Sequence, residues 1–238
     1  MRDSFVRSVL ELAKNDKNVE LVTGDLGFGV LRPFWETVPD QFLNVGIAEQ
    51  NMTAMAAGMA LEGKTVFTYS IGNFPTLRCL EQIRNDCAGQ GADVKIVCVG
   101  GGFAYGSLGM SHHATEDLAI MGAIPNVTVF SPADRLETAA AVRAMLETRG
   151  TCYLRLGRGG EKPVHDRLDF AVGKAIPVRA GVPERVQNPE SQIRSQKTNI
   201  EVLYRQGGQS FHKGISHGVS PFNAAIAPSN SLPSWGKR

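Results

Sequence analysis

The stretch that decides the fold is residues 42–61, FLNVGIAEQNMTAMAAGMAL, with TVFTY following at 65–69. Residues 42–45 have the length and apolar character of a strand, and residues 48–61 have the period of a helix. The next strand-like run begins at residue 65. A strand, a helix and a second strand in this order form a unit whose two strands run parallel. The stretch therefore predicts an α/β domain.

The same alternation of short apolar runs and helical segments continues from Met1 to about Val178. Asp3 is in a position to cap a first helix. The apolar face of that helix carries Val6, Val9, Leu10 and Ala13. The remaining predicted strands are 20–23, 95–99, 127–130 and 152–156, and the remaining predicted helices are 76–88, 115–121 and 134–147. We predict a mostly parallel sheet flanked by helices, with its chemistry in the loops at the carboxyl ends of the strands.

The character of the chain changes after about Val182, where glutamine, asparagine, serine and proline dominate and no apolar period persists. Such a composition is typical of segments that do not build a packed core. We expect a folded domain over residues 1–178 and an irregular, poorly ordered C-terminal tail over residues 179–238. A short strand at 201–204 is the one regular element that the tail suggests.

Composition excludes several classes of protein. The formal net charge is +2 without a concentrated basic face, which argues against nucleic acid as a partner. No run approaches the ~20 apolar residues of a membrane span, and the N-terminus lacks a signal-peptide core. We therefore expect no membrane partner and a cytoplasmic location. The four cysteines lie in apolar stretches without a C-x-x-C pair, which predicts buried, reduced thiols.

Three segments stand in the predicted loops or directly after them. They read VGIAEQNM at 45–52, SIGNFPTLR at 70–78 and GSLGMSHHATED at 106–117. Together they resemble the transketolase family. The second segment, followed by EQIRN at 81–85, is most similar to the forms of that family that are split into two chains. The resemblance covers roughly residues 1–178 and implies the domain that binds the aminopyrimidine ring of thiamine diphosphate.

The resemblance implies a role for one residue of each segment. Glu49 matches the glutamate that hydrogen-bonds N1′ of the aminopyrimidine and activates the cofactor by sharing a proton with that nitrogen. Phe74 matches an aromatic ring that packs on the pyrimidine. His112 matches the active-site histidine that binds substrate and exchanges protons with sugar oxygens, a task for a side chain titrating near neutrality. Each residue also has a purely structural interpretation. Glu49 could be an acid that interacts with the helix dipole in a first turn, Phe74 a core phenylalanine and His112 an exposed loop histidine.

Two smaller matches lie at Asp25 and Arg158. Asp25, in TGDL at 23–26, resembles an aspartate that lies near the thiazolium ring. Arg158 resembles an arginine that contacts the sugar phosphate. Asp25 is equally suited to forming a turn, and Arg158 to being an ordinary surface arginine. The segments depart from the family at Leu108, where an acid is common, and at His113, where a glutamine is common, so the preferred sugar is not predicted.

Two other patterns imitate ligand sites. GGGFAYG at 100–106 follows a strand as a dinucleotide-binding turn would, but its spacing is not G-x-G-x-x-G and no acid follows about 20 residues later. His112, His113, Glu116 and Asp117 suggest a metal site, but only His112 and Glu116 have the spacing of one helix face. We predict no metal bound by this chain.

The missing part of the cofactor site predicts a partner. The family anchors the diphosphate through Mg²⁺ on a G-D-G motif in a separate domain, and this chain lacks that motif. The resemblance therefore implies an N-terminal transketolase subunit that holds Mg²⁺ and the diphosphate, with thiamine diphosphate bound between the chains and two heterodimers forming a heterotetramer. Met52, Met55 and Met59 are candidate interface residues, with plain core packing as the alternative.

The resulting interpretation is a transketolase-type transferase subunit that moves two-carbon ketol units between sugar phosphates and is inactive alone. One alternative is a subunit of a deoxyxylulose-phosphate synthase-like or 2-oxo-acid-decarboxylating enzyme. The other is a truncated, non-catalytic remnant, because the third domain of the family is not recognisable after about residue 182.

Overall fold

The computed structural model describes residues 1–166, 170–173, 205–206 and 209–210. Its centre is a six-stranded sheet in which all neighbouring strands are parallel, in the order β2-β1-β3-β4-β6-β5. The strands are β1 Val19–Thr23, β2 Phe42–Asn44, β3 Thr65–Ile71, β4 Val94–Val99, β5 Thr128–Phe130 and β6 Cys152–Leu156. A separate antiparallel pair joins β7 Arg205–Gln206 to β8 Gln209–Ser210. Every residue of β1 and β4 is buried, as in strands covered on both faces.

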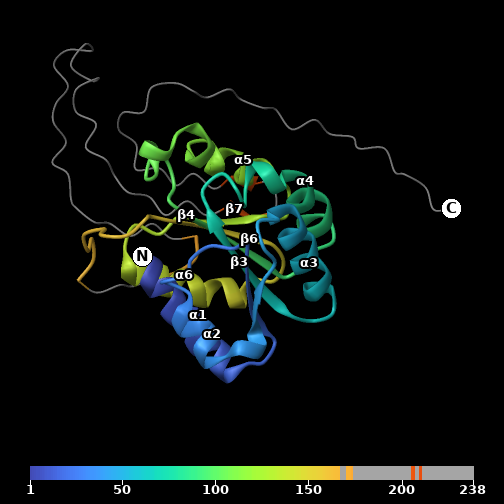
Figure 1. Ribbon diagram of the computed structural model, residues 1–238. Coiled ribbons are helices and arrows are strands. Elements are labelled where there is room, and N and C mark those ends of the chain that lie inside the picture. Colours follow the sequence, from blue (N-terminus) through green and yellow to red (C-terminus); the bar gives the residue numbers. More distant parts are fainter. Residues whose placement is uncertain (167–169, 174–204, 207–208, 211–238) are drawn as a thin grey trace, which may run out of the picture. The chain divides into compact units, whose positions relative to one another are not determined.

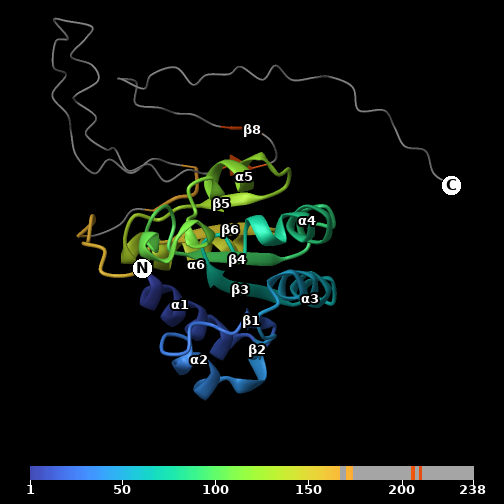
Figure 2. The ribbon, with the colours of Figure 1, turned by 45° about the horizontal axis from the view of Figure 1, so that its top comes forward.

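Helices cover both faces of the sheet (Figure 1). One core cluster joins the sheet to α1 Arg2–Asn15, α2 Arg32–Thr37 and α6 Arg135–Glu147. The second joins it to α3 Glu49–Leu61, α4 Leu80–Gln82 with its continuation as a π-helix over Ile83–Ala88, and α5 Asp117–Ala123. Figure 2 shows α3 and α4 on the opposite side of the sheet from α1 and α6. Single 3₁₀ turns occur at Pro39–Gln41, Leu77–Cys79, Gly106–Leu108 and Met110–His112.

The predicted fold class is confirmed, and all six predicted strands are present to within two residues. The predicted cap of the first helix is wrong. Helix α1 begins at Arg2, with Met1 in the cap position and Asp3 in the first turn. The earlier start follows from contacts of Met1, whose carbonyl accepts from the Phe5 amide at 3.0 Å and whose ammonium group pairs with Glu161 at 3.0 Å.

The single helix predicted over residues 76–88 is divided into three pieces. The Thr76 hydroxyl donates back to the Gly72 carbonyl at 3.1 Å, and the segment then begins with the 3₁₀ turn at Leu77–Cys79. After three α-helical residues the backbone widens into the π-helix, a form that is frequent at functional sites. Helix α2 has no counterpart in the sequence prediction, because its six residues are too few to show a period.

Two sequence predictions concern the C-terminal part of the chain. The domain boundary at residue 178 and the strand at 201–204 both lie outside the described residues. Both therefore stay predictions. Among the helices of the described part, none has the length and apolar character that crossing a membrane requires.

Candidate active site

The segments that follow the carboxyl ends of the strands hold all five residues singled out from the sequence. Asp25 follows β1, Glu49 follows β2, Phe74 follows β3, His112 follows β4 and Arg158 follows β6. The sheet order places β2, β1, β3 and β4 side by side, so four of these segments are neighbours. Because β2 and β3 lie on opposite sides of β1, the sheet has a topological switch point here, which is where open α/β sheets bind ligands.

Glu49 is a buried carboxylate in the first turn of α3. It is only 3% exposed, and an interaction with the helix dipole alone would not require such burial. A methyl group placed on Gly24 would lie 3.4 Å from Cγ of Glu49, so the β1 loop packs directly against the side chain. Nη1 of Arg78 donates to Oε2 of Glu49 at 2.9 Å. Among the described residues, no other side chain bonds to this carboxylate.

Phe74 links the surroundings of Glu49 to His112. The guanidinium carbon of Arg78 lies 4.4 Å from the centroid of the Phe74 ring. The imidazole of His112 meets the same ring edge-on, with the two centroids 4.9 Å apart. Successive contacts therefore connect Glu49, Arg78, Phe74 and His112, which come from three neighbouring segments. We refer to these four residues as the carboxylate–histidine group.

The two adjacent histidines have different surroundings. Oγ of Ser111 lies 3.1 Å from Nδ1 of His112, which leaves Nε2 as the ring nitrogen that can meet a substrate. His113 packs against Phe103 with ring centroids 5.0 Å apart, and its Nε2 lies 3.3 Å from the Gly106 carbonyl oxygen. His113 therefore supports its own loop, and His112 is the histidine that belongs to the carboxylate–histidine group.

Asp25 is an exposed residue in a turn. Its φ angle is 56°, in the left-handed region, which short polar residues tolerate in turns. Asn44 donates to the Asp25 carboxylate at 3.1 Å and accepts from the Asp25 amide at 2.9 Å. The turn-forming reading of Asp25 therefore agrees with its geometry, and a role near the cofactor stays a prediction.

Arg158 contacts the loop that carries His112 through the ring of Tyr105. Its guanidinium carbon lies 4.9 Å from the centroid of the Tyr105 ring, and that ring lies 6.4 Å from the ring of His112. The side chain is exposed. An exposed guanidinium that packs on a ring beside His112 is suited to meeting an anionic part of a substrate.

A buried network beneath the histidine loop has no signal in the sequence. Nη2 of Arg155 donates to the Ala114 carbonyl at 3.0 Å, and its Nε forms an ion pair with Asp117 at 3.0 Å. Tyr153 donates to the same carboxylate at 2.6 Å, and burial raises the pKa of this phenol well above its usual value. Arg155 and Tyr153 lie on one face of β6, so a strand far along the chain holds the loop two residues from His112.

The glycine-rich run at 100–106 serves packing. The amides of Gly100 and Gly101 donate to the Leu156 carbonyl at 2.9 and 3.2 Å. The side chain of Arg155 occupies the space that a Cβ on Gly101 would need. The absence of side chains at these glycines therefore lets the β4 loop close over β6. The amides of Gly100 and Gly101 are already hydrogen-bonded to the Leu156 carbonyl.

A comparison with known families gives one match that spans most of the chain. Residues 1–160 match the model of the "Transketolase, pyrimidine binding domain". The chain belongs to the transketolase family. The resemblance seen in the three sequence segments is thereby confirmed for the domain that carries them.

The curated relatives of this transketolase-family chain include single subunits of larger enzymes. One subunit of the apulose-4-phosphate transketolase of Phocaeicola vulgatus is 38% identical over 177 residues, which are 73% of this chain and 57% of the relative. The 6-deoxy-6-sulfo-D-fructose transketolase subunit of Clostridium sp. strain MSTE9 is 34% identical over 183 residues, 76% of this chain and 57% of that relative. The chain thus spans a little over half the length of these two relatives.

Solved structures support the same fold. A split-gene transketolase described as an inactive beta4 tetramer has a TM-score of 0.67 at 34% identity, covering 76% of this chain and 59% of that one. Transketolase from Leishmania mexicana has a TM-score of 0.60 at 23% identity, covering 66% of this chain and 25% of that one. The second likeness concerns the fold alone.

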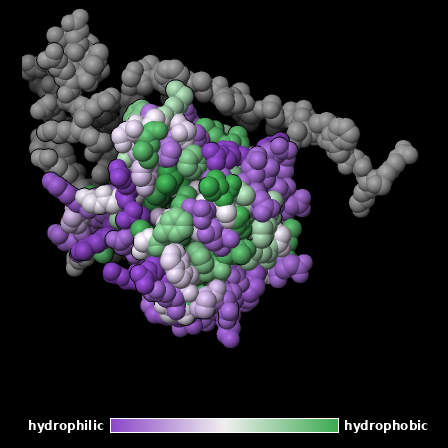
Figure 3. Space-filling view, in the orientation of Figure 1, coloured by the Kyte–Doolittle hydropathy of each residue, from purple (hydrophilic) through white to green (hydrophobic). Residues whose placement is uncertain are grey.

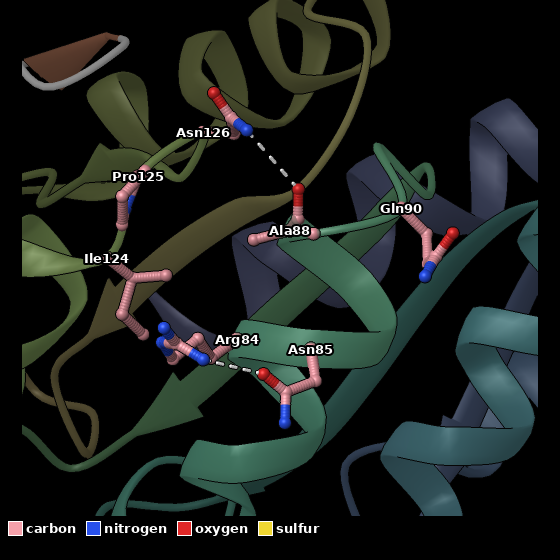
Figure 4. A pocket seen from close by; sticks show the side chains of 8 residues that line it. Arg84, Asn85, Ala88, Gln90, Ile124, Pro125 and Asn126 are labelled. Carbon is pink, nitrogen blue, oxygen red and sulfur yellow. Dashed lines mark hydrogen bonds between the residues drawn. The ribbon is translucent and has the colours of Figure 1, made fainter. Parts of the chain in front are cut away.

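A surface cavity of about 300 Å³ lies at the end of this transketolase-type sheet where the strands begin, opposite the candidate site. Figure 4 shows Arg84 and Asn85 on the helical side and Ile124, Pro125 and Asn126 on a facing loop. These segments lead into the amino ends of β4 and β5, whereas the carboxylate–histidine group follows the carboxyl ends of strands. Within the part of the chain that the structure describes, no three histidine, cysteine or acidic side chains gather as a metal site would require.

Proposed function

We propose that this chain is the pyrimidine-binding subunit of a thiamine-diphosphate-dependent transketolase, which transfers two-carbon ketol units between sugar phosphates together with a partner chain. The observation that supports the proposal most is the carboxylate–histidine group. A buried carboxylate, an aromatic ring and a histidine from neighbouring segments meet at the switch point of the sheet.

The residues present suit the aminopyrimidine ring. One oxygen of Glu49 already bonds an N–H group of a planar cation, and Phe74 already stacks on that same cation. A planar nitrogen heterocycle needs the same two contacts, a hydrogen bond at its edge and an aromatic ring against its face. When bound, thiamine diphosphate supplies the electron sink for breaking and making carbon–carbon bonds beside a carbonyl.

Each residue of the chain then has a defined task. Glu49 shares a proton with the pyrimidine nitrogen, and Phe74 orients the ring. His112 exchanges protons with hydroxyl and carbonyl oxygens of the sugar through Nε2, while Ser111 holds Nδ1. Arg158 binds the sugar phosphate, to which a guanidinium donates in a fork geometry. Asp25 stands near the thiazolium side of the cofactor.

A partner chain completes the site in this proposal. It carries the diphosphate and Mg²⁺, and two heterodimers form the heterotetramer. Relatives described as a transketolase subunit and as the product of a split gene support a two-chain enzyme. The segments of the candidate site and their surroundings also expose large apolar side chains that an interface would cover, namely Phe28, Ile47, Leu77, Phe103, Leu108 and Met110. Figure 3 shows apolar surface towards the middle of one face, with polar side chains around it.

Of the three methionines in α3, only one is clearly a core residue. Met52 is fully buried, while Met55 is 37% exposed and Met59 is half-buried. Met55 is therefore the methionine of this helix that we assign to the partner interface.

The decisive experiment measures binding of thiamine diphosphate with Mg²⁺, and transketolase activity, for this chain alone and mixed with the product of the neighbouring reading frame. We expect tight binding and turnover only in the mixture. Activity of the chain alone would contradict the shared site. A folded chain that neither binds thiamine diphosphate nor shows turnover in the mixture would favour the non-catalytic alternative. Decarboxylation of a 2-oxo acid without ketol transfer would favour the 2-oxo-acid-decarboxylating alternative.

The assignment of Glu49 is tested in the same mixture. We expect Glu49→Gln to lower turnover by about 10²–10⁴-fold, the usual contribution of a positioned acid or base. Glu62→Gln is the matched control, because Glu62 is an exposed acid at the other end of the same helix. Near-normal turnover of Glu49→Gln would contradict the role.

A further inference from the structure

The contacts of Arg78 are unusual because a single side chain engages both residues that the proposed function assigns to the pyrimidine. Its Nη1 donates to Oε2 of Glu49 at 2.9 Å, and its guanidinium carbon lies 4.4 Å from the centroid of the Phe74 ring. The Glu49 side chain is 4% exposed, whereas the Arg78 side chain is 45% exposed. The guanidinium therefore reaches in from the surface and ends between a buried acid and an aromatic ring.

A guanidinium shares the features that make an aminopyrimidine a ligand for this pair. It is flat, it donates N–H groups from its edge, and its face stacks on aromatic rings. Glu49 offers the edge contact and Phe74 the face contact. We propose that Arg78 is a built-in competitor of the cofactor, which occupies the pyrimidine position of the ligand-free chain and leaves it when thiamine binds. This inference rests on the proposed function, because it assumes that Glu49 and Phe74 hold the pyrimidine.

The arrangement explains how Glu49 can stay buried before a cofactor binds. A buried carboxylate without a counter-charge is costly, and Arg78 supplies that charge when no ligand is present. The same contact is easily given up, because ion pairs with a partly exposed partner are weak and the Arg78 side chain already borders solvent. The chain thus protects its acid before assembly and releases it to the cofactor.

The test is the dissociation constant of thiamine, and of thiamine diphosphate with Mg²⁺, for the full chain alone and with its partner, measured by calorimetry. We expect Arg78→Met to lower the dissociation constant by about three- to tenfold, the range expected when a weak competing ion pair is removed. Arg84→Met is the control, because Arg84 is an exposed arginine on the following helix that bonds only to Asn85 among the described residues. We expect no change for it.

A second variant covers the case in which Arg78→Met does not fold. Arg78→Lys keeps the charge beside Glu49 but cannot stack as a planar group on Phe74, and we expect it to bind thiamine more tightly than the parent chain. Methylguanidine added to Arg78→Ala should weaken thiamine binding again, because it restores the competing cation to the site.

The outcomes separate this proposal from the proposed function. Thiamine binding that is unchanged or weaker in both Arg78→Met and Arg78→Lys would overturn the competitor role alone, and weaker binding would make Arg78 a positioning residue. No thiamine binding by any variant or by the parent chain, with or without the partner, would overturn the proposed function and this proposal with it. Loss of binding in Glu49→Gln, together with a gain in the Arg78 variants, is the expected pattern.

Discussion

The ring of Phe74 and the imidazole of His112 meet edge to face, with their centroids 4.9 Å apart, although they belong to segments that follow different strands. The contact depends on a close approach of the two backbones. Gly72, with a φ angle of 38°, lies so near that a Cβ there would be 3.0 Å from the carbonyl oxygen of His112. A glycine after β3 therefore sets the distance between the aromatic ring and the histidine.

Replacing His112 by glutamine should remove proton transfer while leaving the fold intact. In the assembled enzyme we expect a loss of turnover of about 10²–10⁴-fold. The affinity for thiamine diphosphate should stay unchanged, because the imidazole meets Phe74 only at its edge. Steady-state kinetics and calorimetry measure the two quantities on the same protein.

The neighbouring histidine provides the control. His113→Gln removes a ring that packs on Phe103 and bonds to the Gly106 carbonyl, away from the carboxylate–histidine group. We expect near-normal turnover for this variant. Equal losses in the two variants would mean that the histidines act only by keeping the loop folded.

Gly72→Ala should disturb the site through the backbone. The added methyl group would press on a main-chain oxygen of the His112 loop, and the residue would also hold an unfavourable φ angle. We expect a loss of about 1–3 kcal/mol in the free energy of unfolding, with lower turnover. Urea denaturation measures the first effect.

Gly106→Ala is its matched control in the same region. The nearest atom to a Cβ at Gly106 is Cβ of Phe103 at 3.8 Å, an ordinary contact. We expect a change within about 0.5 kcal/mol. If both glycine variants lost the same stability, the close approach at Gly72 would not be the cause.

The sequence predicts the strands well because each is a continuous apolar run between polar loops, and a parallel sheet buries such runs on both faces. Glu49, Phe74 and His112 follow β2, β3 and β4, which lie within four consecutive strands of the sheet, so their grouping at one end of the sheet follows from the topology. The contacts between side chains do not follow. Arg78 looks like any exposed arginine at the start of a helix, and its bond to Glu49 depends on how two separate segments converge.

The same limit applies to Arg155, whose partners Ala114 and Asp117 lie on another loop. Local signals fail for a different reason at the helix start. Asp3 has the right residue type for a cap, but the contacts of Met1 with Phe5 and Glu161 begin the helix earlier. The local sequence allows the helix to start at either place, and the tertiary contact between Met1 and Glu161 favours the earlier start.

The four thiols should be nearly inert in the folded chain. Burial raises the pKa of Cys79 and Cys152 to about 11 and that of Cys87 and Cys98 to about 12, against an ordinary value of 9.0. Since the thiolate is the reactive form, we expect alkylation by iodoacetamide at pH 8 to be at least about 100-fold slower than in urea. Mass spectrometry counts the modified residues, and rapid modification of any of the four in the native chain would contradict the buried assignment.

Asp134 is expected to make stability depend on acid pH. Its carboxylate caps α6 by accepting from the Leu136 and Glu137 amides, and it also accepts from the Val164 and His165 amides and lies 3.1 Å from the His165 ring. Burial alone would raise the pKa of this carboxyl, but the hydrogen bonds from these groups outweigh burial and lower the pKa from 3.8 to about 2. The folded state therefore favours the charged form.

The sign of the effect follows from that direction. A carboxyl whose pKa is lower in the folded chain contributes stability that is fully present above its ordinary pKa and is lost as the pH falls toward the folded value. The contribution is about 2 kcal/mol at neutral pH, since each tenfold change in proton affinity is equivalent to about 1.4 kcal/mol.

Asp134→Asn should therefore lower the free energy of unfolding by about this amount at pH 7, and the difference from the parent chain should shrink between about pH 4 and pH 2. Urea denaturation across this range measures it, with Asp40→Asn, an exposed aspartate, as the control. A difference between Asp134→Asn and the parent chain that stayed constant down to pH 2 would mean that packing, rather than the charge, makes Asp134 stabilising.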